Sequence, residues 1–276
     1  MKHARSRRRL QRRGEPDVLA PPYIFGAAVI GPLHVQRSLP CQDACAYRVH
    51  SSGLVTVAVA DGLGSAAKSQ VGARVAVDAA VSAEKGAAPV TLDGGADLTE
   101  IAKSAAVTAR RAVEAQARLE LCDLRDLACT IIVLAALRDR IAVAHIGDGA
   151  VVALAGSDLI LVSGPGDAEY TNEVVPITAK EWLDDLRVTL PLGGVDCFAV
   201  LTDGCQRAGF RRGDGAVMPH DRFFTPVFSY AKELKTLREG EEEIADLLLS
   251  DKVCNNSDDD KTLVIAVLRR QVELHS

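Results

Sequence analysis

Aromatic residues are scarce in this chain, and long apolar runs are absent from it. Phe, Trp and Tyr make up 4% of the 276 residues, so the core must be built mainly from Val, Leu, Ile and Ala. No apolar stretch approaches the roughly 20 residues that a membrane-spanning helix requires. The basic N-terminal segment is not followed by an apolar run, so it does not resemble a secretory signal. We therefore expect a protein without a membrane span.

The seven cysteines lack the spacing of a disulfide framework or a metal finger. Their number is odd, and most of them lie within apolar segments. Cys41 and Cys45 are four residues apart, but no second pair at zinc-finger spacing follows, so a zinc site is only a minor alternative. We expect buried free thiols and a cytoplasmic location, where thiols stay reduced.

Charge is unevenly distributed along the sequence. The first 13 residues carry seven Lys or Arg and no acid, and removing these seven charges from the formal net charge of −5 leaves −12. An acidic body favours cation binding and makes nucleic-acid binding unlikely. Residues 1–20 lack hydrophobic periodicity and are predicted to form a disordered basic tail. The predicted domain spans residues 21–270, and residues 271–276 form a C-terminal tail.

The order of strand and helix patterns predicts an α+β fold. One helix is predicted after Ser69, with Val71, Val75 and Ala79 on one stripe, and another follows a capping box at Asp97–Glu100. Two further helices are expected between residues 225 and 249. Hairpin-like connections indicate antiparallel sheets with helices outside them. The predicted strands are 23–30, 44–49, 54–60, 129–137, 140–145, 150–154, 159–162, 198–202 and 262–268.

Three apolar strand patterns each adjoin an aspartate. Asp61 and Asp203 follow such strands, and the run Asp258–Asp260 precedes the last one. A strand holds a side chain more rigidly than a loop does, and the glycine after Asp61 or Asp203 leaves space for an ion. A single Asp-Gly pair is usually a turn, but neither of these is followed directly by a returning apolar strand. Carboxylates on separate strands suit Mg2+ or Mn2+.

Five short motifs follow one another along the chain: Gln42-Asp43-Ala44, Asp61-Gly62-Leu63-Gly64, Ile146-Gly147-Asp148, Thr202-Asp203-Gly204 and Asp259-Asp260-Lys261-Thr262. Their order resembles that of the PPM family, the type 2C metal-dependent protein phosphatases, in their bacterial form. The resemblance covers about residues 25–268 and implies a four-layer α-β-β-α sandwich of two mainly antiparallel sheets flanked by helices. It also implies hydrolysis of phosphoserine and phosphothreonine in proteins by a metal-activated water.

The resemblance further implies two divalent cations, Mn2+ or Mg2+, at one end of the sandwich. Asp61, Asp203 and Asp259 would be the catalytic residues, with Asp61 bridging the two ions. Asp43 would orient water near the first ion. The implied metal-site residues are Asp43, Asp61, Gly62, Asp203 and Asp259.

The chain departs from the family pattern at several positions. Gln42 replaces a frequent Glu and is expected to support the site without adding charge, and Leu63 replaces the His of many eukaryotic members. Arg37 lies one residue from the place of the family's phosphate-binding Arg, so it is either a substrate contact or a solvated loop charge. Asp148 and Asp260 are expected to be supporting residues rather than ligands.

Two functions stay open on these grounds. The first is an active phosphatase that acts on a phosphoprotein and opposes a serine/threonine kinase. The second is a phosphatase-like binding or regulatory module with weak or no turnover, which Gln42 and the displaced Arg favour. Residues 164–189 correspond to the family's variable flap, where we expect Trp182 to anchor the flap on the core.

Overall fold

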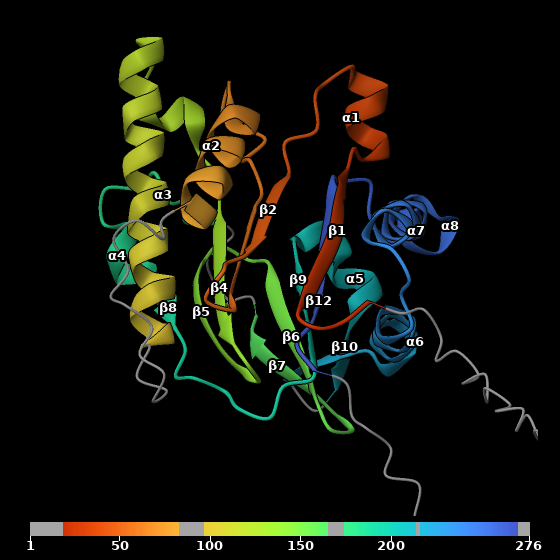
Figure 1. Ribbon diagram of the computed structural model, residues 1–276. Helices are drawn as coiled ribbons and strands as arrows, with labels where there is room; N and C mark the ends of the chain where they lie inside the picture. The colour runs from red at the N-terminus through yellow and green to blue at the C-terminus, as the bar shows by residue number, and fades with distance from the viewer. Residues whose placement is uncertain (1–18, 83–96, 165–173, 214–215, 270–276) are drawn as a thin grey trace, which may run out of the picture.

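Two antiparallel sheets packed face to face occupy the middle of the structure, and helices cover both outer faces (Figure 1). The computed structural model describes residues 19–82, 97–164, 174–213 and 216–269. One sheet has the strand order β1-β12-β9-β6-β7, and the other has the order β2-β3-β4-β5-β8. The predicted α+β fold, an α-β-β-α sandwich, is confirmed.

Nine of the strands are largely apolar segments that the sequence predicted, whereas β8, β10 and β11 were not predicted. The first sheet consists of β1 (Tyr23–Val29), β12 (Lys261–Val267), β9 (Cys197–Leu201), β6 (Ala150–Ala155) and β7 (Asp158–Ser163). The second consists of β2 (Ala44–Val49), β3 (Leu54–Ala60), β4 (Ile131–Leu137), β5 (Arg140–Ile146) and β8 (Arg187–Val188). A separate two-stranded sheet pairs β10 (Phe210–Gly213) with β11 (Ala216–Pro219).

Four longer helices form the outer layers. Side chains of α2 (Ser69–Ser82) and α3 (Leu98–Glu120) pack on the second sheet, and those of α6 (Asp221–Lys232) and α7 (Leu237–Leu249) pack on the first. The carboxylate of Asp97 caps α3 by accepting from the backbone N–H groups of Thr99 and Glu100. The shorter helices are α1 (Pro32–Arg37), η2 (Leu124–Leu127), α4 (Trp182–Asp185), η3 (Asp203–Cys205), α5 (Gln206–Gly209) and α8 (Asp251–Cys254).

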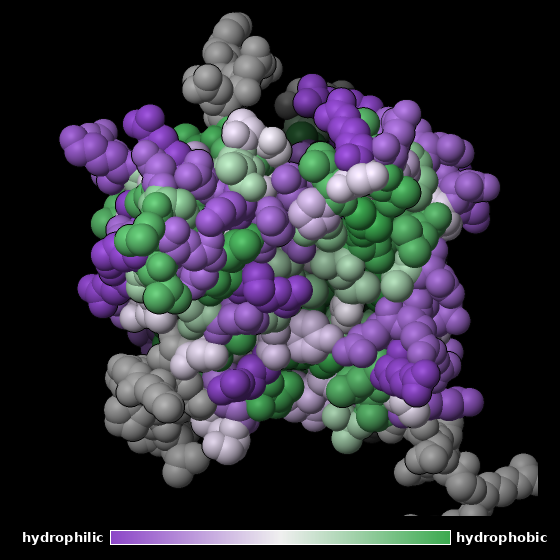
Figure 2. Space-filling view, turned by 90° about the horizontal axis from the view of Figure 1, so that it is seen from above, coloured by the Kyte–Doolittle hydropathy of each residue, from purple (hydrophilic) through white to green (hydrophobic). Residues whose placement is uncertain are grey.

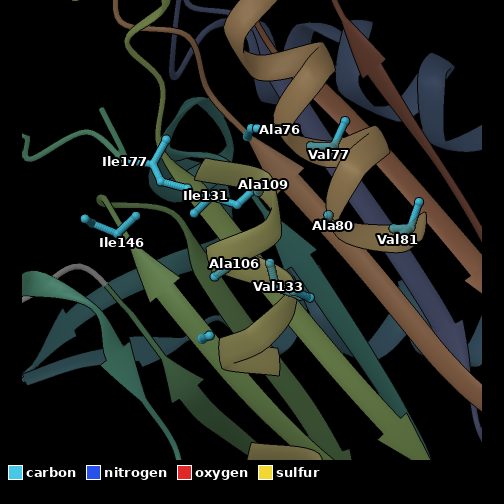
Figure 3. Close-up of a cluster of buried hydrophobic side chains, with 14 of the residues drawn as sticks. Ala76, Val77, Ala80, Val81, Ala106, Ala109, Ile131, Val133, Ile146 and Ile177 are labelled. Atoms are coloured by element: carbon cyan, nitrogen blue, oxygen red, sulfur yellow. The ribbon is translucent and has the colours of Figure 1, made fainter. Parts of the chain in front are cut away.

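Aliphatic side chains fill the three spaces between the four layers, which compensates for the few aromatic residues. Between the sheets lie residues such as Val57, Leu134 and Val264. On the outer face of the second sheet, small side chains let α2 and α3 approach β4 closely. Figure 3 shows part of this cluster, with Ala76 and Ala80 of α2, Ala106 and Ala109 of α3, and Ile131 and Val133 of β4.

The buried stripe of α2 differs from the predicted one. Val71 and Val75 are only half-buried, whereas Ala73, Ala76 and Val77 are fully buried. The buried stripe also includes Gly72, Ala80 and Val81, whereas Ala79 of the predicted stripe is half-buried. Because alanine and valine occur in both stripes, periodicity alone did not show which of them faces the core.

Several predictions concern segments at the edge of the described part of the chain. Residues 1–18, 83–96, 165–173, 214–215 and 270–276 lie outside it, so both predicted tails and the centre of the predicted flap stay predictions. Trp182, within the predicted flap segment, is buried and belongs to the core cluster formed by α2, α3 and the second sheet, in agreement with the expected anchoring. All seven cysteines are free, and three of them are buried. Within the described residues, no helix is long and apolar enough to cross a membrane.

Gly72 provides a test of the close packing between α2 and η2. A Cβ at this position would overlap the carbonyl oxygen of Leu127. Gly72→Ala should therefore lower the free energy of unfolding by about 1–3 kcal/mol, measured by urea denaturation. Gly193→Ala is the matched control, because its Cβ would meet only the Arg140 side chain, at 3.8 Å. Equal effects of the two substitutions would contradict the proposed packing constraint.

Candidate metal centre

Strand ends from both sheets bring the predicted acidic segments to one end of the sandwich. Leu201, the last residue of β9, pairs with Leu263 near the start of β12, so Asp203 and Asp259 leave the first sheet at the same end. Asp61 leaves the second sheet directly after β3. Figure 2 looks onto the molecule from above this end, where hydrophilic side chains lie between hydrophobic ones.

Three carboxylates converge there. Asp61 follows β3, Asp148 lies in the turn between β5 and β6, and Asp203 opens η3. One carboxylate oxygen from each residue lies within 4.8 Å of those of the other two. The sequence assigned Asp61 and Asp203 to the ligands and Asp148 to a supporting role, whereas the structure places Asp148 directly beside the other two.

Backbone hydrogen bonds continue the pairing of β3 and β4 beyond the strand ends and fix Asp61. The Asp61 N–H donates to Thr130 Oγ1 at 2.9 Å, and the Thr130 N–H donates to the Asp61 carbonyl at 2.8 Å. The Gly62 N–H donates to the carbonyl of Gln42 at 3.2 Å. A Cβ on Gly62 would lie 2.8 Å from the Cβ of Ser69, so this close packing requires glycine.

The turn that carries Asp148 is held by two side chains from outside it. Gly147 has a φ of +112°, a conformation that favours glycine, and its carbonyl accepts a hydrogen bond from Arg187 at 2.6 Å. The side-chain amide of Gln206 donates to the carbonyl of Asp148 itself. These contacts fix the backbone of Asp148 relative to β8 and α5.

Asp43 lies deeper than the three converging carboxylates, and two threonines hold it. It is 6% exposed, and its Oδ2 accepts from the hydroxyls of Thr202 and Thr262, each at 2.8 Å. Thr202 directly precedes Asp203, and Thr262 lies beside it in β12. Asp43 therefore connects the segment after α1 with two strands of the first sheet.

Asp260 is used entirely for internal support. It is 2% exposed and accepts from the backbone N–H groups of Gly31 at 2.7 Å and Gln42 at 2.6 Å. Its Oδ2 also lies 2.8 Å from Nδ1 of His34. Because these partners surround α1, Asp260 fastens that helix against the start of β12, consistent with the supporting role expected for it.

A cavity of about 390 Å3 opens over the acidic cluster. Asp259 lines it but is exposed and lies outside the group of three, while its carbonyl accepts from the buried Nζ of Lys261 at 2.6 Å. Arg37, the last residue of α1, also lines the cavity and is exposed. The other predicted site residues on its wall are Gln42, Asp61, Gly62, Asp148 and Asp203.

The acidic side chains of the cluster destabilise one another's charged forms. Burial, followed by the charges of Asp148 and Asp259, raises the pKa of Asp203 to about 7. Burial raises the pKa of Asp43 to about 7, against the lowering effect of the two threonine hydrogen bonds. Burial and the charges of Asp43 and Asp203 raise the pKa of Asp61 well above its usual range. A bound cation would offset this repulsion.

The family model described as protein phosphatase 2C matches residues 30–248. The chain belongs to the protein phosphatase 2C family. It is 33% identical over 250 residues to serine/threonine-protein phosphatase 3 of Escherichia coli K12, covering 87% of this chain and 96% of that protein. The predicted membership of this family and the class of serine/threonine protein phosphatases are confirmed.

Solved structures of phosphatases share this protein phosphatase 2C fold. The catalytic domain of the serine/threonine protein phosphatase PstP, in complex with two manganese ions, has a TM-score of 0.58 at 16% identity, covering 89% of this chain and 97% of that one. Stp1 of Staphylococcus aureus has a TM-score of 0.57 at 12% identity, covering 95% of this chain and all of that one. At such identities the likeness concerns the fold alone.

From the sequence alone, some residues that shape the phosphatase site were given no role. Thr202 and Thr262 lie within the quoted motifs, and a hydroxyl next to an acidic motif was the signal that could have revealed them. Arg187 and Gln206 reach the Asp148 turn from elements that are distant in the sequence. No local pattern marks such contacts, because they depend on how the sheets and helices pack.

The raised pKa values predict how the metal-free protein responds to pH. The folded state keeps protons on Asp43 and Asp203 up to about pH 7, whereas the unfolded chain releases them near the usual value of 3.8. Since the folded state then binds more protons, stability should fall as the pH rises from about 4 to about 7. The melting temperature in the presence of chelator tests this.

Asp203→Asn is the matched variant for this measurement. It removes one of the titrating groups, so the decline of melting temperature across the same pH window should be shallower than in the unsubstituted protein. Saturating Mn2+ should also weaken the decline, because cation binding favours the charged carboxylates. A chelated protein whose melting temperature rises steadily through this window would contradict the electrostatic description.

Proposed function

We propose that the chain hydrolyses phosphoserine and phosphothreonine in proteins and depends on two divalent cations, Mn2+ or Mg2+, held at the candidate metal centre. The observation that carries this proposal is the convergence of carboxylate oxygens from Asp61, Asp148 and Asp203 within 4.8 Å. Membership of the protein phosphatase 2C family supports the reaction type.

The chemistry of these residues fits hard divalent cations. Mg2+ and Mn2+ prefer oxygen ligands, and the group of three supplies only carboxylates. The residues come from three separate elements with fixed backbones, so their positions do not depend on one mobile loop. Their mutual repulsion is high without a compensating positive charge, which favours occupation by cations.

When bound, the cations would supply an activated water and offset charge on the phosphoryl group. The proposed ligands are the carboxylates of Asp61, Asp203 and Asp259 and the carbonyl of Gly62. Asp148 is added to them because its carboxylate lies beside those of Asp61 and Asp203. Asp43, held by two threonine hydroxyls, is proposed to orient water near the first cation.

Gln42 and Asp260 are proposed to act through the backbone rather than through charge. Asp260 accepts from the Gln42 N–H, and the Gln42 carbonyl accepts from Gly62, so the two residues join the start of β12 to the segment after β3. Losing this connection would displace the Gly62 carbonyl. Gln42 also brings one negative charge fewer than Glu would, which weakens the attraction for a cation. The test below therefore includes the alternative of a binding module with weak turnover.

The proposed partner is a phosphoprotein whose phosphate a serine/threonine kinase supplies. A nucleic-acid partner is not proposed, because the chain is acidic apart from its first residues. A cytoplasmic location stays a prediction, supported by the seven free cysteines.

Metal-dependent turnover is the decisive test of this function. We expect Mn2+-dependent hydrolysis of p-nitrophenyl phosphate and of a phosphothreonine peptide, abolished by chelator. Asp61→Asn, Asp148→Asn and Asp203→Asn should each lower kcat/KM more than about 100-fold, since losing even partners outside the ligand set costs about 10–100-fold in metal sites. Asp78→Asn, at an exposed position on α2, is the matched control.

The variants also separate the alternatives. Turnover that is unaffected by all three substitutions would refute the assigned metal site. A protein that binds Mn2+ and phosphopeptide but shows no turnover would support the binding module instead. Loss of activity in Asp61→Asn and Asp203→Asn with little change in Asp148→Asn would return Asp148 to the supporting role that the sequence predicted.

Arg37 is proposed to contact the substrate phosphate, because it lines the cavity at the end of α1. Arg37→Ala should raise KM for a phosphopeptide about 10-fold with a smaller change in kcat, as expected for the loss of a charge-assisted hydrogen bond. Arg37→Lys should restore part of the affinity, because the charge remains while the bidentate geometry is lost. If Arg37→Ala leaves KM unchanged, Arg37 is a solvated charge at the end of α1 and not a substrate contact.

A further inference from the structure

A second, basic hollow adjoins the acidic one. A cavity of about 440 Å3 lies around α5 and the β10-β11 hairpin and is lined by Gln206, Arg207, Phe210, Arg211, Arg212 and Val217. Another cavity of about 440 Å3, whose wall includes Asp148, Asp203 and Asp259, shares Gln206 and Arg207 with it. The two hollows therefore meet at these two residues, one turn of helix beyond Asp203. We call the hollow that holds the three arginines the basic groove.

The three arginines of the basic groove form one ion pair among the residues that the structure describes. Arg207 donates to the carbonyl of Asn256 at 3.4 Å, and Arg211 pairs with Asp221 at 3.2 Å across an exposed, weak contact. Arg212 is exposed and has no ion pair with any residue in the described ranges. Such a cluster of positive charge is unexpected on a protein whose formal net charge is −5.

The groove is held in a fixed position relative to the metal centre. The amide of Gln206 donates to the carbonyl of Asp148, which joins α5 to the acidic turn. At the base of the hairpin, the ring of Phe210 packs on Phe224 with centroids 5.8 Å apart. The His220 N–H donates to the carbonyl of Gly209 at 2.8 Å. The arginines therefore extend from a rigid base rather than from a free loop.

We propose that the basic groove binds an anionic stretch of the phosphoprotein substrate, next to the phosphoserine or phosphothreonine that is hydrolysed. The inference rests on the function proposed above. A substrate segment must cross the acidic cavity, and in extended conformation it advances about 3.3–3.6 Å per residue, so residues a few positions away reach the neighbouring hollow. Guanidinium groups bind carboxylate and phosphate groups through paired hydrogen bonds.

The groove would then set substrate selectivity. The basic groove adjoins the metal centre on one side and attracts acidic side chains of the substrate, so acidic residues should be favoured on one side of the phosphorylated residue and not on the other. Nonspecific attraction between the protein and an anionic peptide would not produce such a one-sided preference, because it would act on both flanks of the phosphorylated residue.

Phosphothreonine peptides with different flanking residues test this inference. One peptide has neutral flanks, two carry three glutamates on the N-terminal or the C-terminal side, and two carry a second phosphoserine on either side. With Mn2+ present, we expect kcat/KM to be about 10-fold higher for a peptide with anionic groups on one side than for the neutral peptide. The glutamate and phosphoserine peptides show whether carboxylate or phosphate is preferred.

The double variant Arg211→Ala/Arg212→Ala should bring this ratio of kcat/KM values close to one. Because the ratio compares two substrates of the same preparation, a change in the folded fraction cancels. Arg211→Glu/Arg212→Glu should invert the preference. Arg111→Ala is the control, since Arg111 is exposed on α3 at the opposite outer face, and it should keep the ratio.

The possible failures can be told apart. If p-nitrophenyl phosphate and all five peptides resist hydrolysis, the proposed function fails and this inference fails with it. If they are hydrolysed but the anionic flanks give no one-sided advantage, only the inference is overturned. It is also overturned if the advantage persists in the Arg211→Ala/Arg212→Ala variant.

Discussion

Mutual repulsion between half-buried carboxylates is the constraint on which the rest of this structure depends. Asp61, Asp148 and Asp203 are brought within 4.8 Å of one another at the ends of strands and in a tight turn, and burial makes their charged forms costly. The two sheets enforce this arrangement, because their core fixes where each strand ends. A cation bound at this cluster would relieve the repulsion and stabilise the folded protein. The same cation would activate water for the proposed phosphatase reaction.

Two further acids hold the segments around the cluster in position. Asp43 and Asp260 are both buried acids near the site, but their oxygens are engaged by hydroxyl and backbone N–H donors. They connect α1, the segment after it and the first sheet into one unit around the cavity. Their role is comparable to that of residues around metal ligands generally, which orient the ligands and tune their charge.

The sequence was sufficient for most of the fold because apolar runs and turns marked the strands clearly. It did not reveal α1, β8 or the β10-β11 hairpin, which are short and are stabilised by tertiary contacts rather than by periodicity. In α2 the buried stripe differs from the predicted one, because alanine and valine occur in both and composition did not distinguish them. For the site, the aspartates at strand ends could be listed in advance, but the proximity of Asp148 could not. It depends on the contacts of Arg187 and Gln206 with its turn.

Diffraction from crystals soaked in Mn2+, recorded at the manganese absorption edge, tests whether the acidic cluster holds two cations. We expect two anomalous peaks between Asp61, Asp148 and Asp203, each within about 2.0–2.6 Å of carboxylate oxygens, as is usual for hard cations. Peaks elsewhere on the protein, or none at this cluster at saturating Mn2+, would contradict this expectation.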